Sequence, residues 1–198
     1  MRIKKLTSEN EKSLARMTAE LLRRGGTAAL PTDTVYGLSA AADKPRAVRR
    51  IARIKERDGK KSFILLISSL AMARKYCFVN KKQAEILKKI WFDRKPGARP
   101  VSAILKSRGF LSKELEAAGS LALRLPRHDF FLSIIRKTGA PVISTSLNIS
   151  GRKTMADVKK IAKYFRELPD LAVDAGPLAA APSRIADLRD SKKIIFLR

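Results

Sequence analysis

The sequence contains few of the residues that metal centres and covalent catalysis use. Among its 198 residues there is one cysteine, Cys77, and one histidine, His128. An intramolecular disulfide, a cysteine-based zinc site and a multi-histidine metal centre are therefore excluded. Any mechanism that needs a Cys-His or Ser-His pair would have to use His128.

Long apolar segments are also missing. No stretch approaches the roughly 20 apolar residues of a membrane-spanning helix. The basic segment 1–6 is followed by polar residues and not by the apolar core of a signal peptide. We therefore expect a cytoplasmic protein that does not bind membranes.

Acidic residues are scarce. The chain has 18 Asp and Glu against 43 Lys and Arg, a formal net charge of +25. Such an excess implies a polyanionic partner or an anionic ligand, and nucleic acid fits best. The alternative is a basic surface typical of the source organism's whole proteome. A basic stripe is expected on the helix predicted over 44–56, at Arg46, Arg49 or Arg50, Arg53 and Arg57.

Two nucleotide-binding motifs are absent. The chain contains neither the G-x-x-x-x-G-K-[ST] loop nor the G-x-G-x-x-G fingerprint. A P-loop or Rossmann assignment therefore has no support.

Helical and strand patterns alternate along the whole chain, without a repeat or a long low-complexity linker. This pattern predicts one α/β domain over residues 1–198. Helices are expected over 11–24, 44–56, 69–76, 81–91, 129–138 and 156–165. Strands are expected over 27–30, 62–67, 101–105, 121–125, 141–144, 171–174 and 193–197, the last two closing the sheet and the last at or near an edge.

A polar cluster follows the strand expected over 27–30. Pro31 cannot donate to a central ladder, so pairing must end or bulge there. Gly37 permits a close backbone approach or a positive φ. Three hydroxyls and a carboxylate lie between these two residues, at Thr32, Asp33, Thr34 and Tyr36. The cluster is either one wall of a binding site or a polar turn whose Asp caps the next helix.

A second polar run, 144–151, begins where the strand expected over 141–144 ends. Basic residues precede the strand expected over 62–67, at Lys55, Arg57, Lys60 and Lys61. Ligands bind at strand ends in open α/β sheets, and cations with hydroxyls and an amide suit a nucleoside triphosphate. The alternative for the basic residues is a solvated charge run.

Five motifs in this order and spacing are specific in combination. They are Pro31-Thr32-Asp33-Thr34-Val35-Tyr36-Gly37-Leu38, the pair Lys55 and Arg57, Leu123-Arg124 with His128, the run Ser144-Thr145-Ser146-Leu147-Asn148, and Ser183. With them the chain resembles, over nearly its whole length, the YrdC-like family. These are the threonylcarbamoyl-AMP synthases that start threonylcarbamoyl adenosine formation in tRNA.

The resemblance implies an α/β fold: an open, twisted mixed β-sheet with flanking helices around a concave basic cleft, in a short form without an extra C-terminal domain. It implies L-threonine, bicarbonate and ATP as substrates, Mg²⁺ bound with ATP, and threonylcarbamoyl-AMP and pyrophosphate as products. The downstream threonylcarbamoyl-transfer proteins are the implied protein partners. The basic surface, with a patch that includes Arg46, Arg50 and Arg53, is expected to hold tRNA or double-stranded RNA.

The resemblance also assigns residues. Threonine-binding positions are Thr34, Arg124, Ser144 and Ser183. ATP-binding positions are Arg57, Lys61, Ser120, Ser146, Thr154 and Arg198. The family's functional quartet matches Lys55, Arg57, Ser146 and Asn148, of which the two cations are expected to neutralise charge on the transferring adenylyl group. Thr32, Asp33 and Tyr36 are left with shaping roles and His128 with a structural one.

Some positions depart from the family pattern. Asp58 and Ser62 alter the loop after Arg57, and an insertion around 92–99 adds positive charge near the expected cleft rim. Leu66 stands where many relatives have a polar residue that touches threonine, and Asp33 replaces a more frequent Glu. These differences bear on amino-acid specificity more than on nucleotide binding.

Two other functions compete with the synthase. In the first, a non-catalytic RNA- or nucleotide-binding protein of the YciO branch, the positive charge carries the function through binding. Loss of the S-x-N pair would favour this function, but Ser146 and Asn148 are both present. The carbamoyl-transfer domain of HypF-type proteins is disfavoured, because it belongs to a much longer chain with zinc-binding cysteines.

Overall fold

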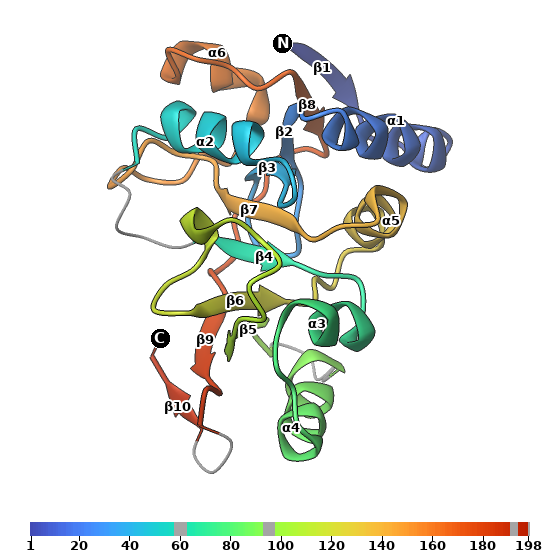
Figure 1. Ribbon diagram of the computed structural model, residues 1–198. Coiled ribbons are helices and arrows are strands. Elements are labelled where there is room, and N and C mark those ends of the chain that lie inside the picture. Colours follow the sequence, from blue (N-terminus) through green and yellow to red (C-terminus); the bar gives the residue numbers. More distant parts are fainter. Residues whose placement is uncertain (58–62, 93–97, 191–193, 198) are drawn as a thin grey trace.

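The computed structural model describes residues 1–57, 63–92, 98–190 and 194–197. Its centre is a ten-stranded mixed sheet with the order β1-β8-β2-β3-β7-β4-β6-β5-β9-β10. Figure 1 shows the sheet from β1 at the top to β10 at the bottom. The expected mixed sheet with flanking helices is confirmed.

The strands are β1 Arg2–Lys5, β2 Thr27–Leu30, β3 Gly37–Ala41, β4 Ile64–Leu66, β5 Val101–Lys106, β6 Ser120–Arg124, β7 Val142–Ser146, β8 Leu171–Asp174, β9 Arg184–Asp187 and β10 Ile195–Phe196. The α-helices are α1 Glu11–Arg23, α2 Pro45–Ile54, α3 Leu70–Tyr76, α4 Lys81–Phe92, α5 Asp129–Thr138 and α6 Ile161–Tyr164. Two 3₁₀ turns are η1 Lys113–Leu115 and η2 Val158–Lys160.

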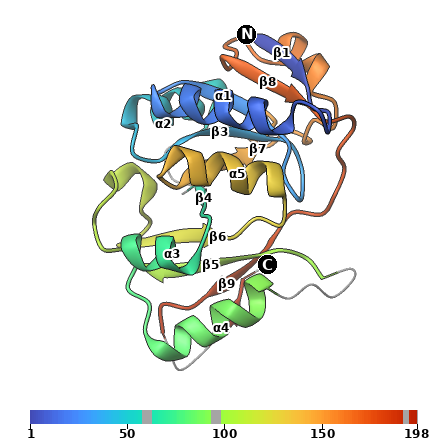
Figure 2. The ribbon, with the colours of Figure 1, turned by 90° about the vertical axis from the view of Figure 1, so that its right-hand side faces the viewer.

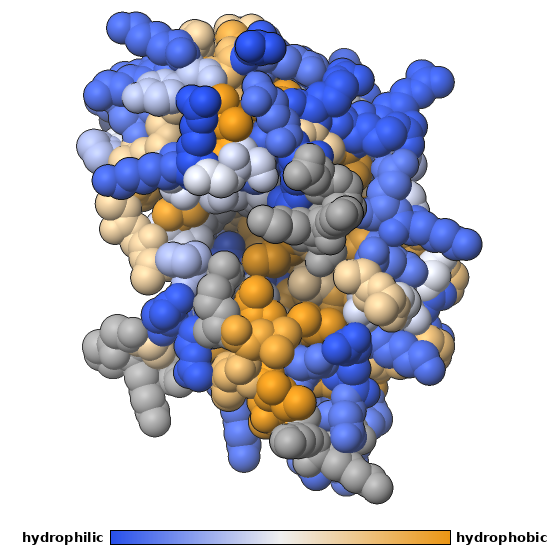
Figure 3. All heavy atoms as spheres, turned by 90° about the vertical axis from the view of Figure 1, so that its left-hand side faces the viewer, coloured by the Kyte–Doolittle hydropathy of each residue, from blue (hydrophilic) through white to orange (hydrophobic). Residues whose placement is uncertain are grey.

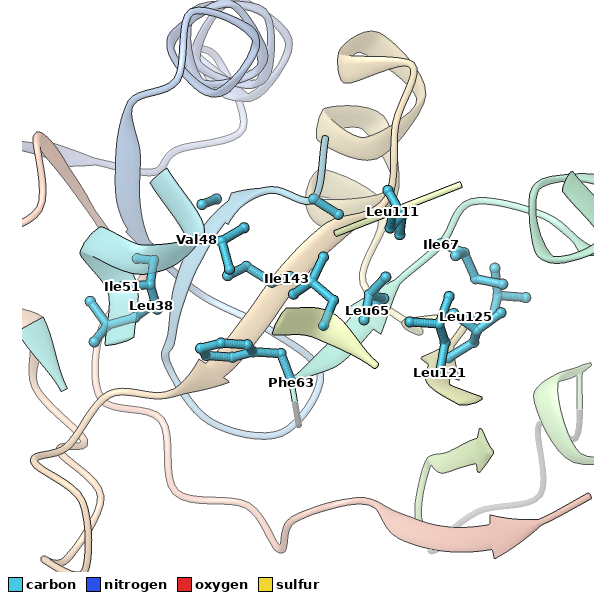
Figure 4. Packing of buried hydrophobic residues seen from close by; sticks show 14 of the residues in the cluster. Leu38, Val48, Ile51, Phe63, Leu65, Ile67, Leu111, Leu121, Leu125 and Ile143 are labelled. Atoms are coloured by element: carbon cyan, nitrogen blue, oxygen red, sulfur yellow. The ribbon is translucent and has the colours of Figure 1, made fainter. Parts of the chain in front are cut away.

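Helices cover both faces of the sheet. On one face α1 and α5 lie side by side, as Figure 2 shows, and bury the apolar stripe that includes Leu14, Leu22, Phe131 and Ile135. On the other face α2, α3 and α4 pack on a larger cluster, part of which is drawn in Figure 4 around Leu65. Strands β8, β2, β3, β7 and β4 contribute residues to both clusters, so apolar contacts bury both faces of this part of the sheet.

Several elements follow their local signals closely. Strand β2 has the expected bounds, and α5 ends at Gly139, which adopts φ 76° as a left-handed C-terminal cap. Pro45 occupies the first turn of α2, where its missing N–H has no intrahelical partner to lose. Asn10 stands at the N-cap of α1, but its side chain accepts from Thr7 N at 3.0 Å instead of capping the helix.

Three strands were not expected. β1 is an exposed, basic edge strand, β3 consists of small residues, and β9 follows an Ala- and Pro-rich segment. Their local sequences have little β-propensity, and pairing with neighbours decides their conformation. The β8 segment was wrongly expected to close the sheet, since it lies between β1 and β2.

Other boundaries differ from expectation. β7 continues to Ser146, so its hydroxyls lie within the strand and not after its end. The helix expected over 156–165 is a 3₁₀ turn followed by the short α6. The helix expected over 44–56 ends at Ile54, which places Arg57 outside it. β10 confirms a terminal strand at the sheet edge, whereas Lys193 lies outside the described residues.

Among the described residues, no helix combines the length and the apolar character that crossing a membrane requires.

Candidate active site

A cleft of about 480 Å³ lies on the sheet where β7, β4, β6, β5 and β9 run side by side. It is lined by Thr32, Thr34, Val35, Tyr36, Gly37, Arg57, Ile64, Ile104, Ala117, Ala122, Arg124, Ser144, Thr145, Ser146, Pro182, Ser183 and Ile185. Figure 3 shows a face hollowed near its centre, with hydrophobic residues in and below the hollow and hydrophilic residues around it.

The floor of the cleft is one row of the sheet. Ser144, Ile64, Ala122 and Ile104 are successive register partners on β7, β4, β6 and β5. Residues opposite one another on neighbouring strands point to the same face. The row therefore places the Ser144 hydroxyl beside an apolar surface formed by the other three residues.

The segment after Pro31 forms one wall of the cleft, and hydrogen bonds of its own hydroxyl groups stabilise it. Thr32 Oγ1 lies 2.9 Å from Thr34 Oγ1 and donates to the Val35 carbonyl at 2.8 Å. Tyr36 Oη donates to Gly176 O at 2.7 Å and accepts from Ala175 N at 2.8 Å. Thr34 thus faces the cleft from a turn that Thr32 and Tyr36 stabilise, as their expected shaping roles require.

Arg124 brings a buried positive charge to the cleft. It is 5% exposed, and its Nη1 lies 3.1 Å from Asp33 Oδ1. The contact lacks hydrogen-bond geometry, so Arg124 Nε and Nη1 have no hydrogen-bond partner within the described part of the chain. Burial lowers the pKa of Arg124, and the Asp33 carboxylate partly opposes this. Unused N–H donors on a charge-compensated guanidinium suit a carboxylate ligand.

Two serines complete this half of the cleft. Ser183 Oγ lies 3.0 Å from Ser102 Oγ. A Cβ on Gly37 would lie 2.1 Å from Ser144 Oγ, so Gly37 serves a close approach of β3 to β7 and has no positive φ. The four expected threonine positions, Thr34, Arg124, Ser144 and Ser183, therefore line one cleft.

Lys55 forms hydrogen bonds with two residues of the second polar run, Ser146 and Asn148. Its Nζ donates to Asn148 Oδ1 at 2.6 Å, Ser146 O at 2.6 Å and Asn148 O at 3.1 Å. Ser146 Oγ donates to the same Asn148 Oδ1 at 2.6 Å. Burial, and secondarily the charge of Arg57, lower the pKa of Lys55 to about 8. Lys55 is 4% exposed and holds the loop behind Ser146, whereas Ser146 itself lines the cleft.

Arg57 reaches the cleft from the segment after α2. Its guanidinium lies 4.5 Å above the centre of the Phe63 ring, and Nη1 donates to Thr145 Oγ1 at 3.1 Å. Burial lowers the pKa of Arg57. Stacking on an aromatic ring fixes the plane of the guanidinium, which suits recognition of phosphate oxygens.

Two further expected ATP positions, Ser120 and Thr154, do not line this cleft. Ser120 donates to Ala117 O at its edge, and Thr154 lines a neighbouring hollow of about 400 Å³ that also contains Asn148. Lys61 and Arg198 lie outside the described residues. So do Asp58, Ser62 and most of the insertion around 92–99.

The expected basic stripe on α2 is largely neutralised. Arg50 donates to Asp170 at 2.7 Å and to Glu167 at 3.0 Å, and Arg53 donates to the same Glu167. Arg49 pairs with Glu114 at 2.8 Å. Arg49, Arg50 and Arg53 are thus paired with carboxylates of neighbouring segments, so most of the expected stripe is engaged within the protein.

Two residues that support the cleft were not predicted from the sequence, and one residue expected to affect threonine binding does not line it. Thr145, between the two assigned serines of β7, binds Arg57, and Ser102 on β5 supports Ser183. Leu66 is fully buried in the core and does not line the cleft. His128 is at the N-cap of α5, and burial lowers its pKa.

Residues 20–198 match the Sua5/YciO/YrdC family model, which is described as "Telomere recombination". The chain is 30% identical to mouse threonylcarbamoyl-AMP synthase over 163 residues, which cover 82% of this chain and 55% of the mouse protein. The chain thus spans about half the length of that relative.

Two solved structures share the fold. P. abyssi Sua5 complexed with L-threonine has a TM-score of 0.87 and 27% identity, covering 100% of this chain and 57% of the Sua5 chain. Escherichia coli YciO has a TM-score of 0.80 and 26% identity, covering 94% of this chain and 89% of YciO. Together with the cleft described above, these matches show that the chain belongs to the Sua5/YciO/YrdC family.

Proposed function

We propose that this protein is an L-threonylcarbamoyladenylate synthase, a nucleotidyltransferase of tRNA modification. The observation that carries the proposal is the gathering of Thr34, Arg124, Ser144 and Ser183 in the cleft that also contains Arg57 and Ser146. A buried guanidinium with unused donors fits an amino-acid carboxylate, and the second cation beside hydroxyls fits phosphate. The relatives named threonylcarbamoyl-AMP synthase and the Sua5 complex with L-threonine support this choice.

The reaction needs no covalent enzyme intermediate. The amino nitrogen of threonine bonds to the carbon of bicarbonate with loss of water, which gives a carbamate. A carbamate oxygen then attacks the α-phosphorus of ATP in line, and the bond to the β-phosphate oxygen breaks to release pyrophosphate. The chain contributes positioning and charge neutralisation, which are the main sources of catalysis in such transfers.

The charged residues divide these tasks. Arg124 binds the threonine carboxylate, and Arg57 neutralises charge on the transferring adenylyl group. Lys55 was expected to share that second task, but its hydrogen bonds favour a different one, which is to hold Ser146 and Asn148 in place.

Mg²⁺ belongs to the proposal as the ion that enters on the ATP phosphates. The described residues include no group of three or more His, Cys, Asp or Glu side chains that could hold a metal. Hydroxyls and cations instead line the cleft, which is consistent with an ion carried by phosphate oxygens. When bound, Mg²⁺ neutralises phosphate charge.

The excess of positive charge supports RNA as a further partner, tRNA or double-stranded RNA. Arg50 and Arg53 of α2 are paired with carboxylates and are poor candidates, so contacts would be spread over other basic surfaces. Binding should weaken steeply with salt because counterions are released from the phosphates. A salt-independent interaction would contradict this. Proteins that transfer the threonylcarbamoyl group to tRNA are the expected consumers of the labile product.

The direct test is pyrophosphate release from ATP, Mg²⁺ and bicarbonate with single amino acids. Threonine-dependent release is expected, and Arg57→Ala should lower it by about 10²–10³-fold while the protein stays folded. Near-normal turnover of Arg57→Ala would refute the assigned role. Silence with every amino acid would favour the alternative function, a YciO-like RNA- or nucleotide-binding protein.

A further inference from the structure

The hydrogen bonds of Thr32 determine what Thr34 can offer to a ligand. Thr32 Oγ1 lies 2.8 Å from the Val35 carbonyl oxygen, 3.0 Å from Thr34 N and 2.9 Å from Thr34 Oγ1. A hydroxyl has one proton to donate and two lone pairs with which to accept. Because a carbonyl oxygen can only accept, the proton of Thr32 points to Val35.

The contact between the two hydroxyls then has one possible direction. Thr34 must donate to Thr32, and the two lone pairs of Thr32 are taken by the Thr34 N–H and the Thr34 O–H. The Thr34 oxygen keeps its lone pairs but has no proton left. Thr34 is 7% exposed and lines the cleft, so these lone pairs are its remaining polar capacity there.

We propose that Thr32 is a positioning residue that makes Thr34 a hydrogen-bond acceptor only, so that Thr34 receives a proton donor of the amino-acid substrate. That donor is the amino group or the side-chain hydroxyl. The inference rests on the proposed function, because it concerns the same threonine site.

This polarity has a consequence for orientation and specificity. Arg124 presents only donors, and Thr34 presents only an acceptor. An amino acid therefore binds with its carboxylate at Arg124 and a donor at Thr34. A ligand that places a methyl group or an acceptor at Thr34 leaves a buried polar atom unpaired, which weakens binding.

The test uses Thr32→Val, which keeps the side-chain shape and removes the hydroxyl. Freed from Thr32, the Thr34 hydroxyl rotates and no longer presents a fixed acceptor. KM for threonine should rise by about three- to tenfold, with KM for ATP unchanged. Thr32→Ser should restore the wild-type value. Thr18→Val is the matched control, because Thr18 is a fully buried threonine on α1 and its Oγ1 has no partner among the described residues.

A double-mutant cycle separates this role from simple support of the turn. If Thr32 acts through the Thr34 hydroxyl, Thr32→Val has no further effect on threonine affinity in a Thr34→Val background. If Thr32 only holds the turn, the two losses multiply, and the inference is overturned. Affinity for threonine measured by calorimetry gives the same comparison without turnover. The role of Thr32 can therefore be refuted in a protein that is an active synthase. Inactivity of the wild-type protein would instead contradict the proposed function.

O-methyl-L-threonine identifies the donor. It retains the amino group and lacks the hydroxyl proton. A penalty relative to threonine that is large in the wild type and smaller in Thr32→Val assigns the substrate hydroxyl to Thr34. An equal penalty in both proteins assigns the amino group. Unchanged threonine affinity in Thr32→Val overturns the inference whichever donor is considered.

Discussion

Gly37→Ala tests the close approach of β3 to β7 that shapes the cleft. The added Cβ would lie 2.1 Å from Ser144 Oγ, about 1.3 Å short of the 3.4 Å at which ordinary contact begins. The next atoms, Ser144 Cβ at 3.5 Å and Thr145 O at 3.6 Å, leave enough room. The clash is thus with the end of one short side chain and not with the backbone.

The expected cost to stability is small. Ser144 relieves the clash by rotation about χ1, at about 0.5–1.5 kcal/mol if the new position is strained. Replacing glycine by alanine also restricts the unfolded chain, which stabilises by about 0.4–1 kcal/mol. The net change should stay within about 1 kcal/mol, or roughly 2–4 °C in Tm for a chain of this size.

The expected cost to function is larger. Rotation removes Ser144 Oγ from its place in the cleft, so one hydrogen bond to threonine is lost and KM for threonine rises by about three- to tenfold. Steady-state pyrophosphate assays and thermal unfolding measure the two effects separately.

The double variant with Ser144→Ala decides whether this reasoning is correct. Without the Ser144 hydroxyl, the Cβ of Ala at position 37 meets only ordinary contacts. Gly37→Ala should then leave KM unchanged and stabilise the protein slightly. An equal rise of KM in both backgrounds, or unfolding of Gly37→Ala, would refute the argument.

Three further predictions concern charged groups. Arg124→Lys should raise KM for threonine more than KM for ATP, because one ammonium replaces a fork of donors; equal changes in steady-state assays would contradict this. Turnover should fall as pH rises through about 8, where Lys55 loses a proton. The melting temperature should not fall over the same range, because a lysine in the unfolded chain binds its proton more tightly and the free energy of unfolding therefore tends to rise between pH 8 and 10.5. Lys55→Arg should lack the alkaline decline in rate, and a decline that persists in this variant would exclude Lys55 as the cause. Asp170→Asn should lower the free energy of unfolding by about 1–2 kcal/mol in urea titrations, by weakening the contacts with Arg50 and Thr27, without changing either KM.

The candidate site could be predicted in part. Residue chemistry alone indicated polar clusters at strand ends, and the resemblance to the YrdC-like family assigned Thr34, Arg124, Ser144 and Ser183 to threonine binding; all four line one cleft of the structure. The resemblance assigned Ser120 and Thr154 to ATP, and neither lines that cleft, because a match of sequence positions does not specify distances between side chains.

Local sequence determined the elements whose signals lie within a few residues. The apolar spacing of α1, the short apolar strand β2 and the left-handed Gly139 after α5 each fix a conformation through nearby contacts. The scarcity of cysteine, histidine and acidic residues likewise fixed which kinds of chemistry the chain can support.

Tertiary structure decided the rest. β3 is a strand because β2 and β7 pair with it on both sides, although its small residues do not favour that conformation. Lys55 holds Asn148, 93 positions away, and Asp33 lies against Arg124. Such contacts depend on how strands are ordered in the sheet. That order minimises the free energy of the whole core, so no local stretch of sequence contains it.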